Sequence, residues 1–444
     1  LYTNDEHGYF YAEGDIYRAA VIQEMWEEEE KKCPECHIIK ISGGDNYTGA
    51  AVSSVFRGES TAKIFKIIGY DVAALGNHEF DFGLEAFRKN EKLSGIEYLA
   101  ANLMDGNFNA PFGTDTTLKV GNTVFGITGL TTGDLKRLAF SKYLDEIHVV
   151  ESENVVERNM RNLSKKAAVQ LVVTHQSLEE SVAWAEKLDK KPLVIFNAHS
   201  HESYLKNIGD TLFVQAGKNM KQYAKVEITR DMGRFYVTDA KLVEVRKTAS
   251  FSSKKSQKIR DITNHYNKKL DKVAGQTIIK ARRDFSLEKF QKLYACSLKH
   301  HSSDADIGMS NPGGFRHEIR RGDVKLKNII SMLPFENRVV ISEIYGRHLP
   351  ENLELAENSI CGAQKKEGNW YIGNKLLNPE KKYKVVIHEF MHRGGDFFEF
   401  RQEDTESTLT SVNWRTPLIS YLKKASSRKK TLEKAFRDIV TFMD

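Results

Sequence analysis

The segment Leu75-Gly76-Asn77-His78-Glu79-Phe80-Asp81 sets an amide and an imidazole side by side directly after an apolar run. Asn77 offers a neutral oxygen ligand for a metal ion, and His78 offers a proton donor. Asp81 follows His78 by three residues, which is close enough to hold the imidazole in one tautomer and to raise its basicity. The segment therefore predicts a catalytic histidine next to a metal ligand.

Four other short stretches in the first half of the chain also end an apolar run in metal-ligand residues. Their ligand candidates are Asp5 with His7, Asp45, His175, and His199 with His201. Asp5 and His7 are two residues apart, on the same side of an extended backbone, and Asp45 follows two glycines that let the backbone approach a ligand closely. One such histidine alone would more often be a hydrogen-bonded core or loop residue. Five stretches together indicate one convergent site.

Predicted strands and helices alternate along this half. Apolar runs predict strands that begin at Ile38 and Asp71, and helical spacing predicts helices over about residues 15–31 and around residues 64–68. Further on, a helix is expected through Val156, Met160 and Leu163, and buried strands are expected at 169–174 and 192–196. Such alternation is typical of an α/β domain that binds its ligands at the carboxyl ends of the strands.

The length of 444 residues predicts two or three domains. A lysine-rich stretch at 254–272 keeps its apolar residues at helical spacing, which predicts a linker helix with one buried stripe. We therefore expect domains at 1–250 and 274–444, joined by a linker at 251–273. The second domain is expected to contain strands at 338–344 and 383–388, glycine loops at 311–316 and 392–396, and helices at 287–298, 326–333, near 416 and at 432–443.

The composition is that of a globular protein with a mild positive charge. The net charge of +6 comes from scattered lysines, so it slightly favours anionic ligands and does not demand nucleic acid. Neither a membrane-spanning apolar run nor a signal-like segment occurs. Residue 1 already belongs to the expected first strand, so we expect the natural start, and any signal peptide with it, to precede this sequence.

The four cysteines are too few for a disulfide scaffold. Cys33 and Cys36 have the spacing of a redox pair or half a zinc site, but no second such pair occurs, which favours a local disulfide or an ordinary loop pair. Cys296 and Cys361 are isolated in the sequence, and we expect them to be buried small apolar groups rather than a bridge.

The ligand candidates combine carboxylate, amide and imidazole groups without a thiolate. They are Asp5, His7, Asp45, Asn77, His175, His199 and His201. This set is too large for one tetrahedral ion and suits two ions about 3.5–4 Å apart that share a carboxylate, as in enzymes of in-line phosphoryl displacement. Oxygen and imidazole ligands indicate Zn²⁺, Mn²⁺ or Fe, and the sequence does not choose among them.

These motifs resemble the 5′-nucleotidase and UDP-sugar hydrolase family of calcineurin-like metallophosphoesterases. The motifs in the first half are Asn4-Asp5-Glu6-His7-Gly8, Gly43-Gly44-Asp45, Gly76-Asn77-His78-Glu79-Phe80-Asp81, Thr174-His175 and Ala198-His199-Ser200-His201. The resemblance implies an α/β fold with an N-terminal metallophosphoesterase αββα sandwich, a linker helix and a C-terminal α/β substrate-binding domain.

The resemblance also implies roles for the motif residues. Asp5, His7, Asp45 and His201 would hold one metal, and Asp45, Asn77, His175 and His199 would hold the other. His78, supported by Asp81, would stabilise the phosphate in the transition state while a metal-bound hydroxide attacks phosphorus in line.

In the second half the resemblance rests on Asn311-Pro312-Gly313-Gly314-Phe315-Arg316, Leu333-Pro334-Phe335-Glu336-Asn337, Phe390 and Gly394-Gly395-Asp396. It implies that Arg316 contacts phosphate, that Asn311 and Asp396 contact polar groups of the substrate, and that Phe335 and Phe390 contact the two faces of a base. Pro312 stands where the family usually has glycine, the helix at 284–294 lacks the Gly-Asn pair of the family, and Arg282 and Arg283 are alternative positions for a family arginine. These differences affect which leaving group the resemblance implies, and they do not affect the predicted metal ligands.

The sequence therefore predicts a metal-dependent phosphomonoesterase whose ligand is a small phosphate ester, most simply a nucleotide. The alternatives are a phosphatase for a sugar phosphate or another ester without a base, a UDP-sugar hydrolase, and a non-catalytic binding protein, which the complete ligand set disfavours. A nuclease would need a basic groove with interleaved aromatic residues, which we do not find. The resemblance implies a periplasmic, secreted or cell-surface location and leaves the cytoplasm open, and neither it nor the composition gives the oligomeric state.

Overall fold

The computed structural model describes residues 1–11, 16–139, 144–246, 251–404 and 407–443. The chain divides into two compact units. Unit 1 comprises Leu1–Thr48, Val52–Leu135 and Lys142–Lys268, and unit 2 comprises Gly49–Ala51, Lys136–Ser141 and Lys269–Asp444. The predicted helix start at residue 15, the predicted domain end at residue 250 and the last residue, 444, lie outside the described residues.

The first sheet of unit 1 brings the amino-terminal strands together in parallel. Its order is β14-β13-β1-β2-β3-β4, with β1 to β4 parallel and β13 antiparallel to both of its neighbours. The strands are β1 (Tyr2–Thr3), β2 (Ile41–Ser42), β3 (Val72–Ala74), β4 (Glu97–Leu99), β13 (Gln222–Asp231) and β14 (Arg234–Glu244). The connecting helices are α1 (Arg18–Lys32), α2 (Ala51–Ser54), α3 (Glu59–Ile68) and α4 (Leu84–Ser94).

The second sheet has the order β11-β12-β10-β9-β7-β6, with parallel strands in the centre and antiparallel strands at both edges. Its strands are β6 (Asp115–Val120), β7 (Thr123–Leu130), β9 (Val169–Thr174), β10 (Val194–Phe196), β11 (Ser203–Ile208) and β12 (Thr211–Ala216). The remaining elements of this region are α5 (Leu135–Leu138), α6 (Ser152–Leu163), α7 (Leu178–Ala185) and the pair β5 (Leu103–Met104) and β8 (His148–Val149).

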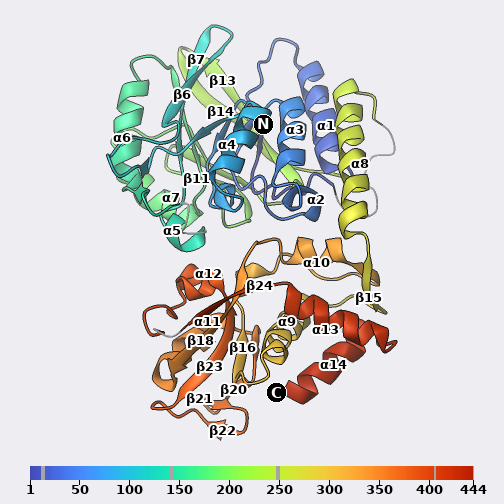
Figure 1. The fold of residues 1–444 in the computed structure, drawn as a ribbon. Helices are drawn as coiled ribbons and strands as arrows, with labels where there is room; N and C mark the ends of the chain where they lie inside the picture. The colour runs from blue at the N-terminus through green and yellow to red at the C-terminus, as the bar shows by residue number, and fades with distance from the viewer. Residues whose placement is uncertain (12–15, 140–143, 247–250, 405–406, 444) are drawn as a thin grey trace. The chain divides into compact units, whose positions relative to one another are not determined.

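The two sheets pack face to face between two layers of helices. Val72 of the first sheet and Val173 of the second belong to one buried apolar cluster, which is the core between the sheets. On the far face of the second sheet, Val156 of α6 and Trp184 of α7 share a cluster with Ile195. Helices α1, α3 and α4 cover the first sheet (Figure 1). The predicted αββα sandwich is therefore confirmed.

Helix α8 (Lys254–Ala274) covers the lysine-rich stretch that was predicted to be a linker helix. Its apolar stripe includes the buried residues Ile259 and Leu270. The Tyr266 hydroxyl donates to a carboxylate oxygen of Glu59 on α3 at 2.7 Å, so the amino-terminal part of α8 packs on unit 1.

Unit 2 is an α/β unit around a five-stranded sheet of order β19-β16-β23-β18-β24, in which β16 and β23 are parallel. These strands are β16 (Ile307–Met309), β18 (Arg338–Tyr345), β19 (Ile360–Cys361), β23 (Lys382–His388) and β24 (Thr408–Asn413). Smaller sheets contain β15 (Thr277–Ala281) with β17 (Gly322–Lys325), and β20 (Ala363–Lys366), β21 (Asn369–Ile372) and β22 (Lys375–Leu376). The helices are α9 (Leu287–His301), α10 (Leu326–Met332), α11 (Leu349–Ala356), α12 (Glu389–His392), α13 (Thr416–Ser427) and α14 (Leu432–Met443).

Helices cover both faces of this sheet. Leu298 of α9, Leu418 of α13 and Ile439 of α14 share one buried cluster with Val386 of β23. Leu353 of α11 packs into a second cluster with other residues of β23. The predicted C-terminal α/β domain is therefore confirmed.

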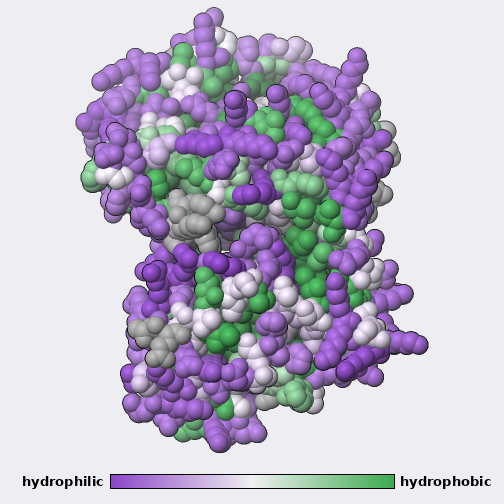
Figure 2. All heavy atoms as spheres, in the orientation of Figure 1, coloured by the Kyte–Doolittle hydropathy of each residue, from purple (hydrophilic) through white to green (hydrophobic). Residues whose placement is uncertain are grey.

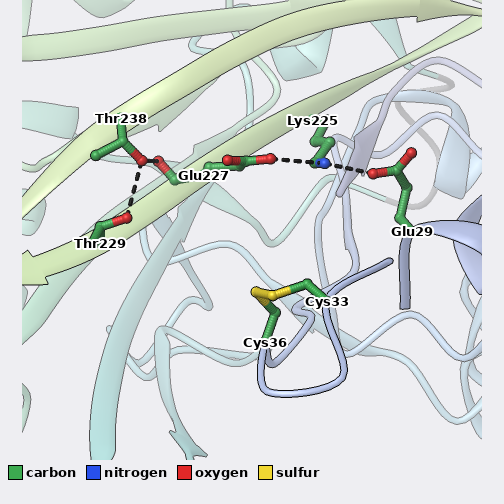
Figure 3. Close-up of a disulfide and its surroundings, with 7 residues drawn as sticks. All are labelled: Glu29, Cys33, Cys36, Lys225, Glu227, Thr229 and Thr238. Carbon is green, nitrogen blue, oxygen red and sulfur yellow. Dashed lines mark hydrogen bonds and ion pairs between the residues drawn. A yellow bond between two sulfur atoms is a disulfide. The ribbon is translucent and has the colours of Figure 1, made fainter. Parts of the chain in front are cut away.

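Both cysteine pairs are disulfides. Cys33 and Cys36 close a tight loop after α1 (Figure 3), which agrees with the prediction of a local disulfide. Figure 3 also shows Lys225 of β13 between the carboxylates of Glu29 and Glu227. The expectation that Cys296 and Cys361 are unbridged was wrong. They form a disulfide between α9 and β19 across 65 residues of sequence, because the helix packs directly on that strand.

The described part of the chain contains no helix that combines the length and apolarity needed to cross a bilayer. Hydrophilic residues predominate on the face shown in Figure 2. Strands β11 to β14 have no counterpart in the sequence prediction. In β14 the exposed positions largely alternate with half-buried ones, whereas β12 is buried along its whole length.

Candidate metal centre

The ligand candidates of unit 1 lie just beyond the carboxyl ends of parallel strands. Tyr2 pairs with Ile41 and Ile41 with Val72, so the loops after β1, β2 and β3 meet at one edge and bring Asp5, Asp45 and Asn77 together. Strands β9 and β10 are parallel neighbours in the second sheet and deliver His175 and His199 in the same way. Parallel pairing therefore explains why residues distant in sequence converge here.

One group consists of Asp5, His7 and His201. Asp5 Oδ1 lies 3.4 Å from His201 Nε2 and 3.9 Å from His7 Nε2, and the two imidazole nitrogens are 3.0 Å apart. Two nitrogen ligands on one ion, at bond lengths of about 2.0–2.1 Å and angles between square and tetrahedral, are separated by about 2.9–3.4 Å. The separation of the two nitrogens falls within this range.

A second group consists of Asp45, His175 and His199. His175 Nε2 lies 3.1 Å from Asp45 Oδ2, and the rings of His175 and His199 have centroids 5.1 Å apart. His175 Nε2 is also 4.0 Å from Asp5 Oδ1, which joins this group to the first. The structure thus brings six of the predicted ligands into two adjacent groups.

Backbone carbonyls fix the orientation of two of these histidines. His7 Nδ1 lies 2.9 Å from the Thr48 carbonyl oxygen, and His175 Nδ1 lies 2.7 Å from the Gly43 carbonyl oxygen. A carbonyl only accepts, so Nδ1 carries a proton in both rings, and Nε2 is the nitrogen that faces the group and would coordinate once a metal ion replaces any proton on it. At His201, Lys218 Nζ lies 3.2 Å from Nδ1 and adds a positive charge beside the group.

Asn77, His78 and Asp81 lie beside the second group. Asn77 is buried, and the backbone N–H of His78 donates to Asp45 Oδ1 at 2.8 Å. His78 Nδ1 lies 2.9 Å from Asp81 Oδ2, the contact expected from their spacing. The His78 ring is 5.4 Å from the His7 ring, so it lies next to the ligand groups without belonging to either of them.

Two buried glutamates, which the sequence prediction did not single out, hold the ligand loops. Glu79 accepts hydrogen bonds from the backbone N–H groups of Gly76 (2.8 Å), Asp45 (2.9 Å) and Asn46 (2.7 Å). Glu6 accepts from the Asn46 amide at 2.6 Å. Their positions inside predicted motifs were the available signal, because Glu6 lies between Asp5 and His7 and Glu79 directly follows His78.

Several ligand candidates adopt the left-handed backbone conformation, which non-glycine residues rarely adopt. Their φ angles are 50° for Asp5, 48° for His7, 57° for Asp45, 74° for His199 and 63° for His201. Such strain persists only where the surrounding structure determines it, and it is concentrated at functional sites. Its occurrence at five ligand candidates supports one shared function.

The electrostatics of the groups favour ionised carboxylates. Burial alone would raise the pKa of Asp5, but the His201 and His175 imidazoles hold it well below its usual range. Burial opposes ionisation of Asp45 as well, and His175 and His78 lower its pKa well below the ordinary value. Burial, together with the charge of His175, lowers the pKa of His199 to about 4, so this imidazole is neutral and able to coordinate.

The donor set fits divalent metal ions. Asp5 Oδ1 is buried, and within the described residues no donor makes a hydrogen bond to it although three imidazole nitrogens lie within 4.0 Å. A carboxylate oxygen surrounded by imidazoles is expected where a cation completes the contacts. All four cysteines are in disulfides, so the site is one of oxygen and nitrogen ligands.

The predicted substrate residues of unit 2 lie in two connected pairs. Asn311 Nδ2 donates to Asp396 Oδ2 at 2.6 Å, and the Arg316 guanidinium lies 4.9 Å from the centre of the Phe335 ring. Phe335 is held through its carbonyl, which accepts from Trp414 Nε1 at 2.7 Å. Phe390 is connected to the first pair through His388, because the two rings stack at 6.3 Å and His388 Nε2 lies 2.8 Å from Asn311 Oδ1.

Two family descriptions match the chain. Residues 1–203 match calcineurin-like phosphoesterases, and residues 255–403 match the C-terminal domain of 5′-nucleotidases. A 5′-nucleotidase of Vibrio cholerae is 26% identical, with 89% of this chain and 84% of the relative covered. An apyrase of Tabanus yao is 23% identical, with 87% and 82% covered.

The fold also matches solved structures. A 5′-nucleotidase precursor from Thermus thermophilus superimposes with a TM-score of 0.82 at 20% identity, with 95% of each chain covered. At this level of identity the likeness shows a shared fold.

Proposed function

The chain belongs to the 5′-nucleotidase family of metal-dependent phosphomonoester hydrolases, and on that premise we propose that it releases phosphate from nucleotides at the two ligand groups of unit 1. The observation that carries the proposal is the convergence of Asp5, His7 and His201 with Asp45, His175 and His199 in adjacent buried groups. A structural role does not explain this arrangement, since burying so many ionisable groups is costly unless something binds them.

We assign the first metal ion to Asp5, His7, Asp45 and His201, and the second to Asp45, Asn77, His175 and His199. When bound, a pair of Zn²⁺, Mn²⁺ or Fe ions supplies Lewis acidity at the phosphate and lowers the pKa of a water molecule, which are the requirements of in-line displacement. The proposal that Asp45 is shared is supported by its contacts with both groups, because its carboxylate lies beside His175 and its backbone carbonyl accepts the N–H of His7 at 2.9 Å.

His78 is proposed to stabilise the phosphate as charge develops. Asp81 holds its Nδ1 at 2.9 Å, so the ring orientation is fixed and Nε2 is the atom that would meet a phosphate oxygen. Glu79 keeps the loops of Asp45 and Asn77 in register through three backbone hydrogen bonds. The ligands and the phosphate-contacting group are therefore positioned before the substrate arrives, which is the main source of electrostatic catalysis.

Unit 2 is proposed to bind the nucleoside part of the substrate. Phe335 and Phe390 are partly exposed aromatic side chains and would contact the base, and Asn311 with Asp396 would contact polar groups. Arg316 is proposed to contact phosphate, and its present position over the Phe335 ring keeps it next to the aromatic surface. Base stacking on such residues contributes about 1–3 kcal/mol for each aromatic side chain.

We also propose that the protein acts outside the cytoplasm. Its disulfides, Cys33–Cys36 and Cys296–Cys361, support this location, because disulfides persist in oxidising compartments.

The test is a substrate panel. Chelated protein is supplied with Mn²⁺ or Zn²⁺, and phosphate release is measured from nucleoside mono-, di- and triphosphates, sugar phosphates and a UDP-sugar. We expect activity that depends on added metal and a higher kcat/KM for nucleoside monophosphates than for sugar phosphates. If kcat/KM for sugar phosphates equals or exceeds that for nucleotides, a sugar-phosphate substrate replaces the nucleotide in the proposal. Activity that persists in the chelated protein without added metal would refute the proposed metal sites.

A further inference from the structure

His388 is a buried imidazole that the predicted site does not contain. It is the last residue of β23 and is 1% exposed, and burial lowers its pKa to about 3, so the ring is neutral. Strand β23 runs parallel to β16 with Val386 opposite Gly308, which places His388 beside the start of the loop that carries Asn311.

The hydrogen bonds around Asn311 fix the state of this ring. Asn311 Nδ2 donates to Asp396 Oδ2 at 2.6 Å, so the amide oxygen is the atom that faces His388 Nε2 at 2.8 Å. An amide oxygen accepts, so His388 carries its proton on Nε2. Within the described residues Nδ1 is buried without a hydrogen-bond partner, so the ring directs its one hydrogen bond to Asn311.

The surrounding packing leaves the network little freedom. The His388 ring stacks at 6.3 Å from the Phe390 ring and packs edge-on at 5.0 Å from Trp414. A side chain at Gly314 would lie 2.8 Å from Asn311 Oδ1, and one at Gly395 would lie 2.5 Å from the Phe390 ring. An apolar residue would fill the position of His388 without leaving a buried nitrogen unsatisfied, so the hydrogen bond to Asn311 is the interaction that distinguishes the imidazole from such a residue.

We propose that His388 is a positioning residue for substrate binding: as the neutral Nε2–H tautomer, it sets the orientation of the Asn311 amide and, through it, the position of Asp396. The inference rests on the proposed function, because Asn311 and Asp396 are assigned to the nucleoside. His388 also stacks on Phe390, so one side chain links the polar and the aromatic parts of the nucleoside site. It acts through its neighbours and is not itself a contact of the reacting phosphate.

The kinetic test compares three substitutions at one position. His388→Leu removes the donor, His388→Gln places an amide N–H near the position of Nε2, and His388→Asn places one near the position of Nδ1, too short to reach Asn311. We expect His388→Leu and His388→Asn to raise KM for AMP about tenfold, as for a misoriented polar contact, with kcat changed little. His388→Gln should recover most of the loss, and hydrolysis of glycerol 3-phosphate should be unchanged in all three variants.

A double-mutant cycle adds a result that a merely structural role would not give. If His388 acts through Asn311, then His388→Leu combined with Asn311→Ala should raise KM for AMP no further than Asn311→Ala alone. Additive effects, a KM for AMP within twofold of the wild type in His388→Leu, or equal losses with AMP and glycerol 3-phosphate would each overturn the proposal.

The tautomer of His388 supplies a measurement that does not depend on the substrate. Imidazole ¹⁵N chemical shifts of the metal-loaded protein, with the resonance assigned by its loss in His388→Gln, should show a neutral ring protonated on Nε2 at pH 7. A ring protonated on Nδ1 or on both nitrogens would refute the inference. If the wild type releases no phosphate from AMP, the proposed function fails, while the tautomer still decides whether the network exists.

Discussion

Replacing Glu79 tests how unit 1 holds its ligand loops. The buried carboxylate accepts three backbone N–H groups, from Gly76, Asp45 and Asn46, at 2.7–2.9 Å. Leaving a buried donor unsatisfied costs about 1–3 kcal/mol. Glu79→Ala leaves three donors unsatisfied, which by itself would lower the free energy of unfolding of unit 1 by about 3–9 kcal/mol. Burial and the nearby Asp45 raise the pKa of Glu79 to about 8, so ionised Glu79 destabilises the folded wild type. The alanine variant lacks this unfavourable charge, which offsets part of the loss.

We therefore expect the free energy of unfolding of unit 1 to fall by about 3 kcal/mol in Glu79→Ala, the lower end of that range. Such a loss is a large fraction of the stability of a typical domain, about 5–15 kcal/mol. Glu79→Gln keeps one acceptor oxygen and should lose less stability, yet it should bind Mn²⁺ more weakly than the wild type because the Asp45 loop is held by fewer bonds.

The assay is urea denaturation of the metal-free protein, followed by hydrogen exchange of peptides from unit 1, so that its unfolding is separated from that of unit 2. Glu85→Ala, at an exposed position of α4, is the matched control and should stay within about 0.5 kcal/mol of the wild type. A loss below about 1 kcal/mol in Glu79→Ala would refute the reasoning, because three buried donors would then have found other partners.

His78→Ala should lower kcat by a factor of about 10²–10³ while the protein keeps its full metal content. The control His265→Ala, at an exposed position, should change neither kcat nor the metal content. Loss of one metal ion from His78→Ala would show that His78 is a ligand. Replacing both Phe335 and Phe390 with alanine should raise KM for a nucleoside monophosphate strongly and leave a small base-free ester nearly unchanged, and equal effects on both substrates would assign the pair to packing. The Lys63 and Tyr266 hydrogen bonds lower the pKa of Glu59 from 4.5 to about 2, so its contribution to stability is present above pH 4.5 and lost as the pH falls towards 2. The difference in unfolding midpoint between the wild type and Glu59→Gln should therefore shrink between pH 5 and pH 3, and a constant difference would contradict this sign.

The predictable part of the site was the part that follows apolar strands. Asp45 and His175 each come after a run that is buried on both faces of a sheet, and parallel pairing then brings such strand ends together. The same signal occurs at His388, which ends the apolar run of β23. The sequence around this histidine did not indicate which residue would be its partner. Its partner, Asn311, is adjacent only because β16 and β23 are neighbours in the sheet.

The unpredicted features depend on contacts that local pattern does not record. Cys296 and Cys361 meet because α9 packs on β19, and nothing in the intervening sequence indicates that packing. Strands β13 and β14 are long but half exposed, so their side chains lack the apolar runs by which the buried strands were recognised. Glu79 belongs to a predicted motif, yet its three backbone contacts arise from the close approach of two loops.

The central claim is that unit 1 holds two metal ions that share Asp45, and metal stoichiometry tests it most directly. Chelated protein is dialysed against Mn²⁺, and bound metal is measured per chain by elemental analysis for the wild type and for Asp45→Asn. Thermal unfolding of each protein with and without Mn²⁺ checks that the variant is folded. The account predicts two ions in the wild type and weakened binding of both in Asp45→Asn, because one carboxylate serves each site. One ion or none in the wild type, or two tightly bound ions in Asp45→Asn, would contradict it.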